Sequence, residues 1–215
     1  FVQRRIDQLN GYDKFPADYT RPQRTHPLLH TIIFVSGAAV LALELLASRI
    51  MTPYFGVSLY IWAGVLSITL ISLAIGYWAG GKLTNVRGMD ASRLLELFGL
   101  APALAAMFIV LACLVYPYTF APLAIWSLIS GSFAACLLFL GAPLILASAM
   151  NPLLVAILQR EGGRSGDSGS GQVFFVSTVG SVAGVLITAF GLIPYMSHFD
   201  AVLIVAIVLA GLSAL

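Results

Sequence analysis

Long apolar runs, separated by short polar segments, dominate the chain. Each run is close to the roughly 20 apolar residues that a helix needs to cross the hydrocarbon core of a bilayer. The pattern therefore predicts an all-α fold, a polytopic membrane bundle of six transmembrane helices. We place the spans at about 28–50, 59–83, 93–116, 132–158, 172–193 and 201–215.

The polar segments between the runs predict how the chain turns. Residues 1–27 form a polar tail, and the Gly- and Ser-rich residues 159–171 are typical of a flexible linker. The apolar stretch from Pro117 to Leu158 is too long for one crossing, and its first part, residues 117–131, contains two prolines. We expect them to form an interfacial or re-entrant segment; if they cross instead, the bundle has a seventh span.

The composition narrows the class of protein. Hydrophobic residues make up 60% of the 215 residues and charged residues 9%, whereas soluble domains carry roughly 25% charged residues. A soluble globule and a disordered chain are both excluded. The spans leave no room for a soluble domain of about 100 residues. Because the chain starts at Phe1 and stops inside an apolar run, we expect it to be part of a longer chain. Any soluble catalytic domain would then follow Leu215.

The distribution of positive charge predicts the orientation. Of the eleven Lys and Arg residues, all except Arg49 lie in or beside the tail, the polar loop at 84–93 and the linker at 159–171. Loops rich in Lys and Arg face the cytoplasm. We therefore expect an integral membrane protein with its N-terminus in the cytoplasm, and six spans return the C-terminus to the same side.

Glu44 is the residue with the clearest chemical meaning. It lies sixteen residues into the first expected span, about 24 Å along a helix that rises 1.5 Å per residue. An ionisable group at such a depth is costly and marks a functional site or a structural ion pair. Arg49 lies five residues further on and about 140° around the helix. Its side chain could extend outward to the membrane surface, or it could pair with Glu44 if the helix bends before Pro53. Both interpretations stay open.

Small residues and prolines mark helix contacts and helix breaks. Small residues four apart let helices approach closely, so we expect packing faces at Gly76 and Gly80 and at Gly180 and Gly184, with Gly37 on the same helix face as Glu44. Asn151 is followed directly by a helix breaker, and such breaks line binding sites in some transporters. The expected breaks are Pro53, Pro143 and Pro152.

The remaining reactive side chains do not form a cofactor site by their spacing. His26 and His30 lie at one end of the first span and His198 lies at the opposite side, so we expect no metal site and no cofactor in this chain. Cys113 and Cys136 lie in apolar segments and are typical of core packing. Nothing in the sequence indicates a nucleophile with its base, or a surface for nucleic acid.

An ordered set of short motifs resembles the membrane region of transmembrane spermidine synthase-like (polyamine aminopropyltransferase-like) proteins. The resemblance covers about residues 33–195. The matching segments are Ser36-Gly37 with Glu44 and Arg49, Phe55-Gly-Val-Ser58, Gly76-Tyr-Trp-Ala-Gly-Gly-Lys-Leu83, Gly141-Ala-Pro143 with Asn151-Pro-Leu-Leu154, and Gly171 to Gly184. The sequence departs from the family pattern at Ser177, where Asn is usual, and over residues 117–131.

The resemblance implies a membrane domain, in a bacterial inner membrane, that anchors a cytoplasmic aminopropyltransferase-type domain after Leu215. In that case Glu44 is the expected contact for a cationic substrate. Two other functions stay open: a non-catalytic accessory subunit of a larger membrane complex, with neighbouring subunits as partners, and a small transporter. The lipid bilayer is the expected surrounding in all three cases.

Overall fold

The computed structural model describes residues 27–86, 90–162 and 166–214, and helices make up nearly all of them. No strand occurs among these residues. In chain order the elements are α2 (Pro27–Phe55), α3 (Leu59–Thr84), α4 (Ala91–Trp126), α5 (Leu128–Cys136), the π-helical turn η3 (Leu137–Gly141), α6 (Ala142–Gly162), α7 (Gly166–Ile187), the π-helical turn η4 (Thr188–Leu192) and α8 (His198–Leu212). The expected polar tail lies outside the described residues, except that Pro27 begins α2.

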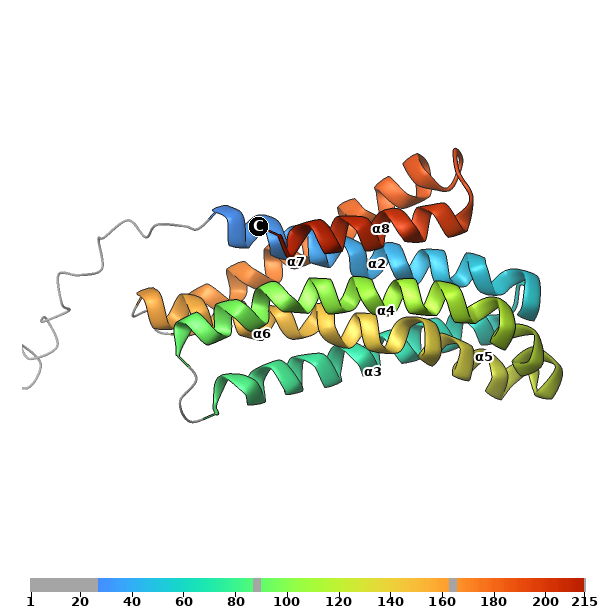
Figure 1. Ribbon diagram of the computed structural model, residues 1–215, viewed down its shortest axis with the longest axis horizontal. Helices are drawn as coiled ribbons and strands as arrows, with labels where there is room; N and C mark the ends of the chain where they lie inside the picture. The colour runs from blue at the N-terminus through green and yellow to red at the C-terminus, as the bar shows by residue number, and fades with distance from the viewer. Residues whose placement is uncertain (1–26, 87–89, 163–165, 215) are drawn as a thin grey trace, which may run out of the picture.

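The helices form an elongated bundle in which α2 is the central element (Figure 1). It contacts α3, α4, α6, α7 and α8, and it is the most buried of the long helices. Five continuous helical stretches are long and apolar enough to cross a membrane. The sixth expected span corresponds to α8, which has 15 residues. The all-helical architecture is thus confirmed for the described residues, with five long apolar stretches and one shorter helix.

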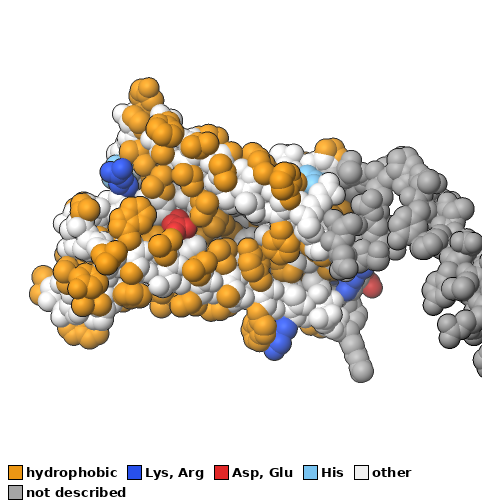
Figure 2. All heavy atoms as spheres, turned by 180° about the vertical axis from the view of Figure 1, so that it is seen from behind, with side chains coloured by type: hydrophobic (Ala, Val, Ile, Leu, Met, Phe, Trp, Pro, Cys, Tyr) orange, Lys and Arg blue, Asp and Glu red, His pale blue; other side chains and the backbone are white. Residues whose placement is uncertain are grey.

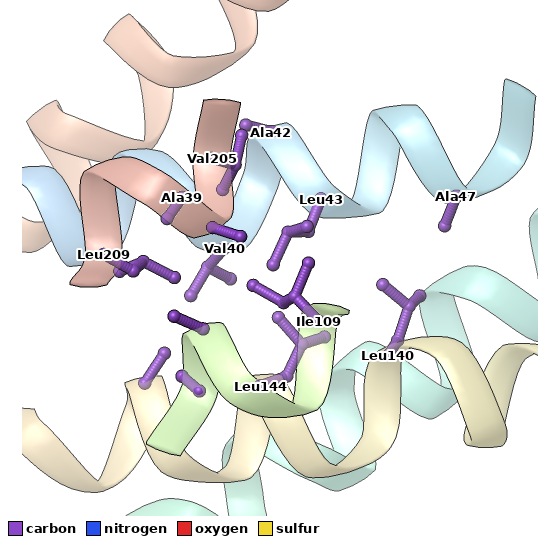
Figure 3. Close-up of a cluster of buried hydrophobic side chains, with 14 of the residues drawn as sticks. Ala39, Val40, Ala42, Leu43, Ala47, Ile109, Leu140, Leu144, Val205 and Leu209 are labelled. Atoms are coloured by element: carbon purple, nitrogen blue, oxygen red, sulfur yellow. The ribbon is translucent and has the colours of Figure 1, made fainter. Parts of the chain in front are cut away.

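The core of the bundle lies where α2, α4, α6 and α8 meet. Figure 3 shows Leu43 of α2 pointing toward Ile109 of α4 and Leu144 of α6, while Val205 of α8 lies beside α2. All four side chains are buried. Because lipid tails are as apolar as leucine, the stability of such a core comes from close packing between the helices.

The third expected span does not end before Pro117, and the interfacial or re-entrant position of residues 117–131 stays a prediction. Helix α4 continues through Pro117 and Pro122 to Trp126, and the chain turns at Ser127. There the backbone is extended, and the Ser127 hydroxyl accepts a hydrogen bond of 3.3 Å from the Ser130 amide, which starts α5. A proline removes only one backbone hydrogen bond, and apolar helices tolerate this loss when local adjustments satisfy the freed groups. The turn therefore coincides with the serine that caps α5.

The expected linker at 159–171 is also largely helical. Helix α6 extends to Gly162 and α7 begins at Gly166, so only residues 163–165 lie outside the described part of the chain. The prediction relied on the low helix propensity of Gly and Ser. This propensity amounts to at most about 1 kcal/mol per residue and is a weak guide where a long helix continues from the segment.

None of the three expected proline breaks ends a helix. Pro53 lies in the last turn of α2, which ends at Phe55. Gly56 follows the helix with a positive φ of 75°. Pro152 lies inside α6. Pro143 follows the π-helical turn η3. Because a proline ring clashes with the carbonyl four residues earlier, the wider turn lets the helix pass Pro143 without ending.

Candidate functional site: a half-buried carboxylate and a polar seam

Glu44 lies in the interior of α2 and is half-buried. In the described part of the chain its carboxylate has no hydrogen-bond or ion-pair partner. The other acidic side chains that the structure describes lie near helix starts: Asp90 and Glu96 at α4, and Asp200 at α8. Among these acidic residues, Glu44 is the one in the interior of a long apolar helix, where a charged side chain is costly.

The structure does not pair Glu44 with Arg49. Arg49 is exposed, and no ion pair joins these two described side chains. Helix α2 continues through Pro53 to Phe55 without a break. With a regular helix between them, the two residues point about 140° apart. The position of the carboxylate is thus not explained by an ion pair with Arg49.

The surface around the bundle is apolar over most of its length. Figure 2 shows that apolar side chains cover most of this face, that basic side chains lie toward its two ends, and that an acidic side chain lies within the apolar area. The exposed apolar side chains include Leu66 and Leu70 of α3 and Leu186 of α7. Such a surface suits the hydrocarbon of a bilayer.

Helices α2 and α7 are in close contact along a line of small residues. A Cβ atom added at Gly180 would overlap the Phe34 carbonyl, and one at Gly184 would overlap the Ala38 carbonyl. A Cβ atom at Gly37 would likewise overlap the backbone of Ser177. The three glycines thus let the two backbones touch, and the order of the contacts shows that α2 and α7 run parallel.

Polar side chains join this contact to the neighbouring helices, and we call the group the polar seam: Tyr77, Asn151, Ser177 and Ser181. The Ser181 hydroxyl donates to the carbonyls of Gly37 at 2.9 Å and Ser177 at 3.0 Å. Asn151 of α6 donates from Nδ2 to the Ser177 hydroxyl at 3.4 Å. Tyr77 of α3 interacts with the Asn151 side chain. Four helices therefore meet around Asn151.

Asn151 is the most buried member of the polar seam. Its side chain is 3% exposed, and its Oδ1 atom has no partner among the described residues. Buried polar atoms usually have a partner, so an orphaned acceptor indicates a missing donor or a strained arrangement. Asn151 thus has one free acceptor in the interior of the bundle.

Helices α3 and α6 form a second close contact. A Cβ atom at Gly76 would overlap Ser148 and the Ile145 carbonyl, and one at Gly80 would lie 2.6 Å from both the Ala149 carbonyl and Pro152. The Ser148 hydroxyl donates to the Ile145 carbonyl at 3.1 Å. The structure places Gly76 and Gly80 between helices, where small residues are needed.

Several residues of the site have no clear signal in the sequence. Single Ser and Tyr residues are common in apolar helices, so Tyr77, Ser177 and Ser181 become recognisable only when their partners are known. The one available signal is the spacing of Ser177, Ser181 and Gly184, which repeats at about one helical turn. Like the Oδ1 atom of Asn151, the buried hydroxyl of Thr69 has no hydrogen-bond partner among the described residues.

The described residues contain no group of three or more His, Cys, Asp and Glu side chains that could hold a metal ion. Cys113 and Cys136 are buried and not joined to each other. The Cys136 sulfur lies 3.4 Å from the Met51 sulfur, which connects α5 to α2. Both thiols have the surroundings of packing residues.

No family model, no curated protein and no solved structure matches the chain. The resemblance of its motifs to spermidine synthase-like membrane regions therefore stays a hypothesis.

Proposed function

We propose that the chain is a membrane-embedded helical domain with its N-terminus in the cytoplasm. The support is physical: five helical stretches have the length and apolarity of membrane spans. The exposed basic residues Lys82, Arg93 and Arg160 lie at the end of α3, the start of α4 and the end of α6. In an up-and-down bundle these three positions fall on one side, which the positive-inside rule assigns to the cytoplasm.

Within this domain we propose that Glu44 receives the ammonium group of a cationic substrate. A single observation carries the proposal: a half-buried carboxylate in the interior of an apolar helix has no partner in the described residues. An ammonium ion would supply the missing charge and a charge-assisted hydrogen bond. The polar seam, two helical turns away at Gly37, would hold α2 and α7 in place.

The motif resemblance extends this proposal to a whole protein. It implies that a cytoplasmic aminopropyltransferase-type domain follows Leu215 and that the membrane domain anchors it in a bacterial inner membrane. The cationic substrate would then be an amine. This part of the proposal depends on the resemblance alone, and it requires a protein longer than these 215 residues.

Amine binding to the purified chain in lipid nanodiscs tests the role of Glu44. Radiolabelled putrescine, spermidine and decylamine would be measured separately on the wild type and on Glu44→Gln, which keeps the size of the side chain and removes the charge. We expect at least one amine to bind saturably, and its affinity to fall at least about tenfold in Glu44→Gln. The factor follows from losing a hydrogen bond to a charged group, about 1.5–3 kcal/mol.

The matched control is Glu96→Gln, because Glu96 is an exposed carboxylate near the start of α4. It changes the net charge by the same amount and should bind amines as the wild type does. Equal binding by wild type and Glu44→Gln, or no saturable binding of any amine, would contradict the proposal.

A second candidate function is that of a subunit in a larger membrane assembly. The observation in its favour is an apolar groove of about 400 Å³ between α4 and α8. Small residues line it on both helices, which is typical of surfaces where helices associate. The lining residues are Ala103, Ala106, Met107, Val110, Leu203, Ala206, Ile207 and Ala210. Native mass spectrometry after gentle extraction tests this function: wild type should retain a partner that Ala210→Phe loses, because Ala210 is an exposed residue of the groove.

A further inference from the structure

We propose that the ligand of Glu44 is an amphiphilic monoamine that reaches the carboxylate from the bilayer, rather than a soluble polyamine. This inference rests on the cation site proposed above and specifies the class of its ligand. It follows from three features of the surroundings of Glu44: its depth in α2, its apolar neighbours and its isolation from other acidic groups.

The depth of Glu44 separates it from water at both ends of the helix. It lies 17 residues after Pro27 and 11 residues before Phe55 in α2. These separations correspond to about 25 Å and about 16 Å of helix. A fully soluble cation would have to cross this length of apolar surface, whereas an amine with an alkyl chain is already concentrated in the bilayer.

The residues beside Glu44 on α2 are apolar, and so is Phe190 of η4, an element that contacts α2. On α2, Leu41 and Leu45 flank it and are themselves only partly buried. Helix α7 runs parallel to α2, with Gly184 against Ala38, and the π-helical turn η4 continues it in contact with α2. Six further residues along each chain segment lead to Glu44 on α2 and to Phe190 on η4. Phe190 is 74% exposed. An alkyl chain could therefore lie along apolar side chains while its ammonium group pairs with the carboxylate.

The isolation of Glu44 argues against a ligand with several charges. The other described acidic side chains lie near the starts of α4 and α8 rather than in the interior of a long helix. Spermidine carries three ammonium groups, and only one could pair with Glu44. The others would be left without a counter-charge in an apolar setting, which is unfavourable. One carboxylate in an apolar surface matches one ammonium group on an apolar body.

Protection from a hydrophobic carbodiimide tests this inference on the full chain in nanodiscs. The carboxylic acid of Glu44 adds across one C=N bond of dicyclohexylcarbodiimide, and its proton goes to nitrogen. The resulting O-acylisourea rearranges to a stable N-acylurea, which peptide mass spectrometry locates. We expect labelling of Glu44 in the wild type and none at this position in Glu44→Gln. Decylamine should slow the labelling at least about fivefold.

Two further reagents identify what the site recognises. Decanol has the same alkyl chain without a charge, and spermidine has the charges without the chain; neither should slow the labelling more than twofold or so. Glu96→Gln should be labelled and protected as the wild type is. As an independent readout, decylamine should raise the unfolding temperature of the wild type and of Glu96→Gln, but not that of Glu44→Gln.

The outcomes separate this inference from the function on which it rests. If spermidine protects as well as decylamine, the ligand class is wrong while the cation site stands. If decanol protects as well as decylamine, the charge is not recognised and the inference fails. If the carbodiimide does not label Glu44, the carboxylate is not reached from the bilayer, which also overturns it. If labelling occurs and no amine slows it, both the inference and the cation site fail.

Discussion

The Ser181 hydroxyl donates a hydrogen bond of 2.9 Å to the carbonyl oxygen of Gly37, joining residues 144 positions apart in the chain. The bond depends on Gly37 having no side chain, because a Cβ atom there would overlap the backbone of Ser177. A glycine on α2 and a serine on α7 thus act together. The contact holds the two helices together two helical turns before Glu44.

Replacing Gly184 by alanine should weaken this helix contact. The added Cβ atom would meet the backbone of Ala38, which cannot move aside as a flexible side chain would. We expect the free energy of unfolding to fall by about 1–3 kcal/mol, the usual cost of overpacking. Titration with sodium dodecyl sulfate, followed by circular dichroism, measures it. Gly211→Ala is the control, because a Cβ atom there meets nothing within 4 Å.

The hydrogen bond between Asn151 and Ser177 should appear as a coupling energy. The two side chains join α6 to α7 at 3.4 Å, and interhelical hydrogen bonds in membranes average about 0.6 kcal/mol. A double-mutant cycle of Asn151→Ala and Ser177→Ala should give a coupling of that size. A cycle with Ser213→Ala, whose hydroxyl bonds within its own helix, should give none. Equal coupling in both cycles would contradict this prediction.

The aromatic rings of Tyr54, Tyr116 and Phe120, near the end of α4, should contribute to the free energy of unfolding. Phe120 is fully buried, and its ring centroid lies 5.6 Å from that of Tyr54 and 5.4 Å from that of Tyr116, both edge to face. Phe120→Ala should lower the free energy of unfolding by about 3–5 kcal/mol. Tyr118→Ala, at an 81% exposed position on the same helix, should change it little. The same unfolding titration compares them.

The proposed orientation predicts which turns a membrane-impermeant maleimide reaches in intact cells. In a background where Cys113 and Cys136 are alanine, a cysteine replacing the exposed Tyr195, between η4 and α8, should be labelled from outside. A cysteine replacing the exposed Asn85, after α3, should be labelled only once the cells are permeabilised. The reverse pattern would show the opposite orientation.

The span positions were predictable because they depend on a property of each segment alone. The length of an apolar run does not depend on its neighbours, so α2, α3 and the apolar stretch Ser170–Leu192 lie close to the expected spans. Helix ends were less predictable. Pro117 and Pro122 suggested a break, yet the helix ends only where Ser127 caps the next one, since apolar surroundings penalise any other exposure of the backbone.

The sequence by itself determined the helical class, the approximate spans and the unusual position of Glu44, because apolarity and charge are properties of single residues. It also marked the glycines at which helices could meet. Only the tertiary structure decided which helices those glycines join, that Asn151 meets Ser177, and that Arg49 leaves Glu44 without an ion pair. The physical reason is that a helix face has no preferred partner until close packing, which depends on every neighbouring helix, selects one.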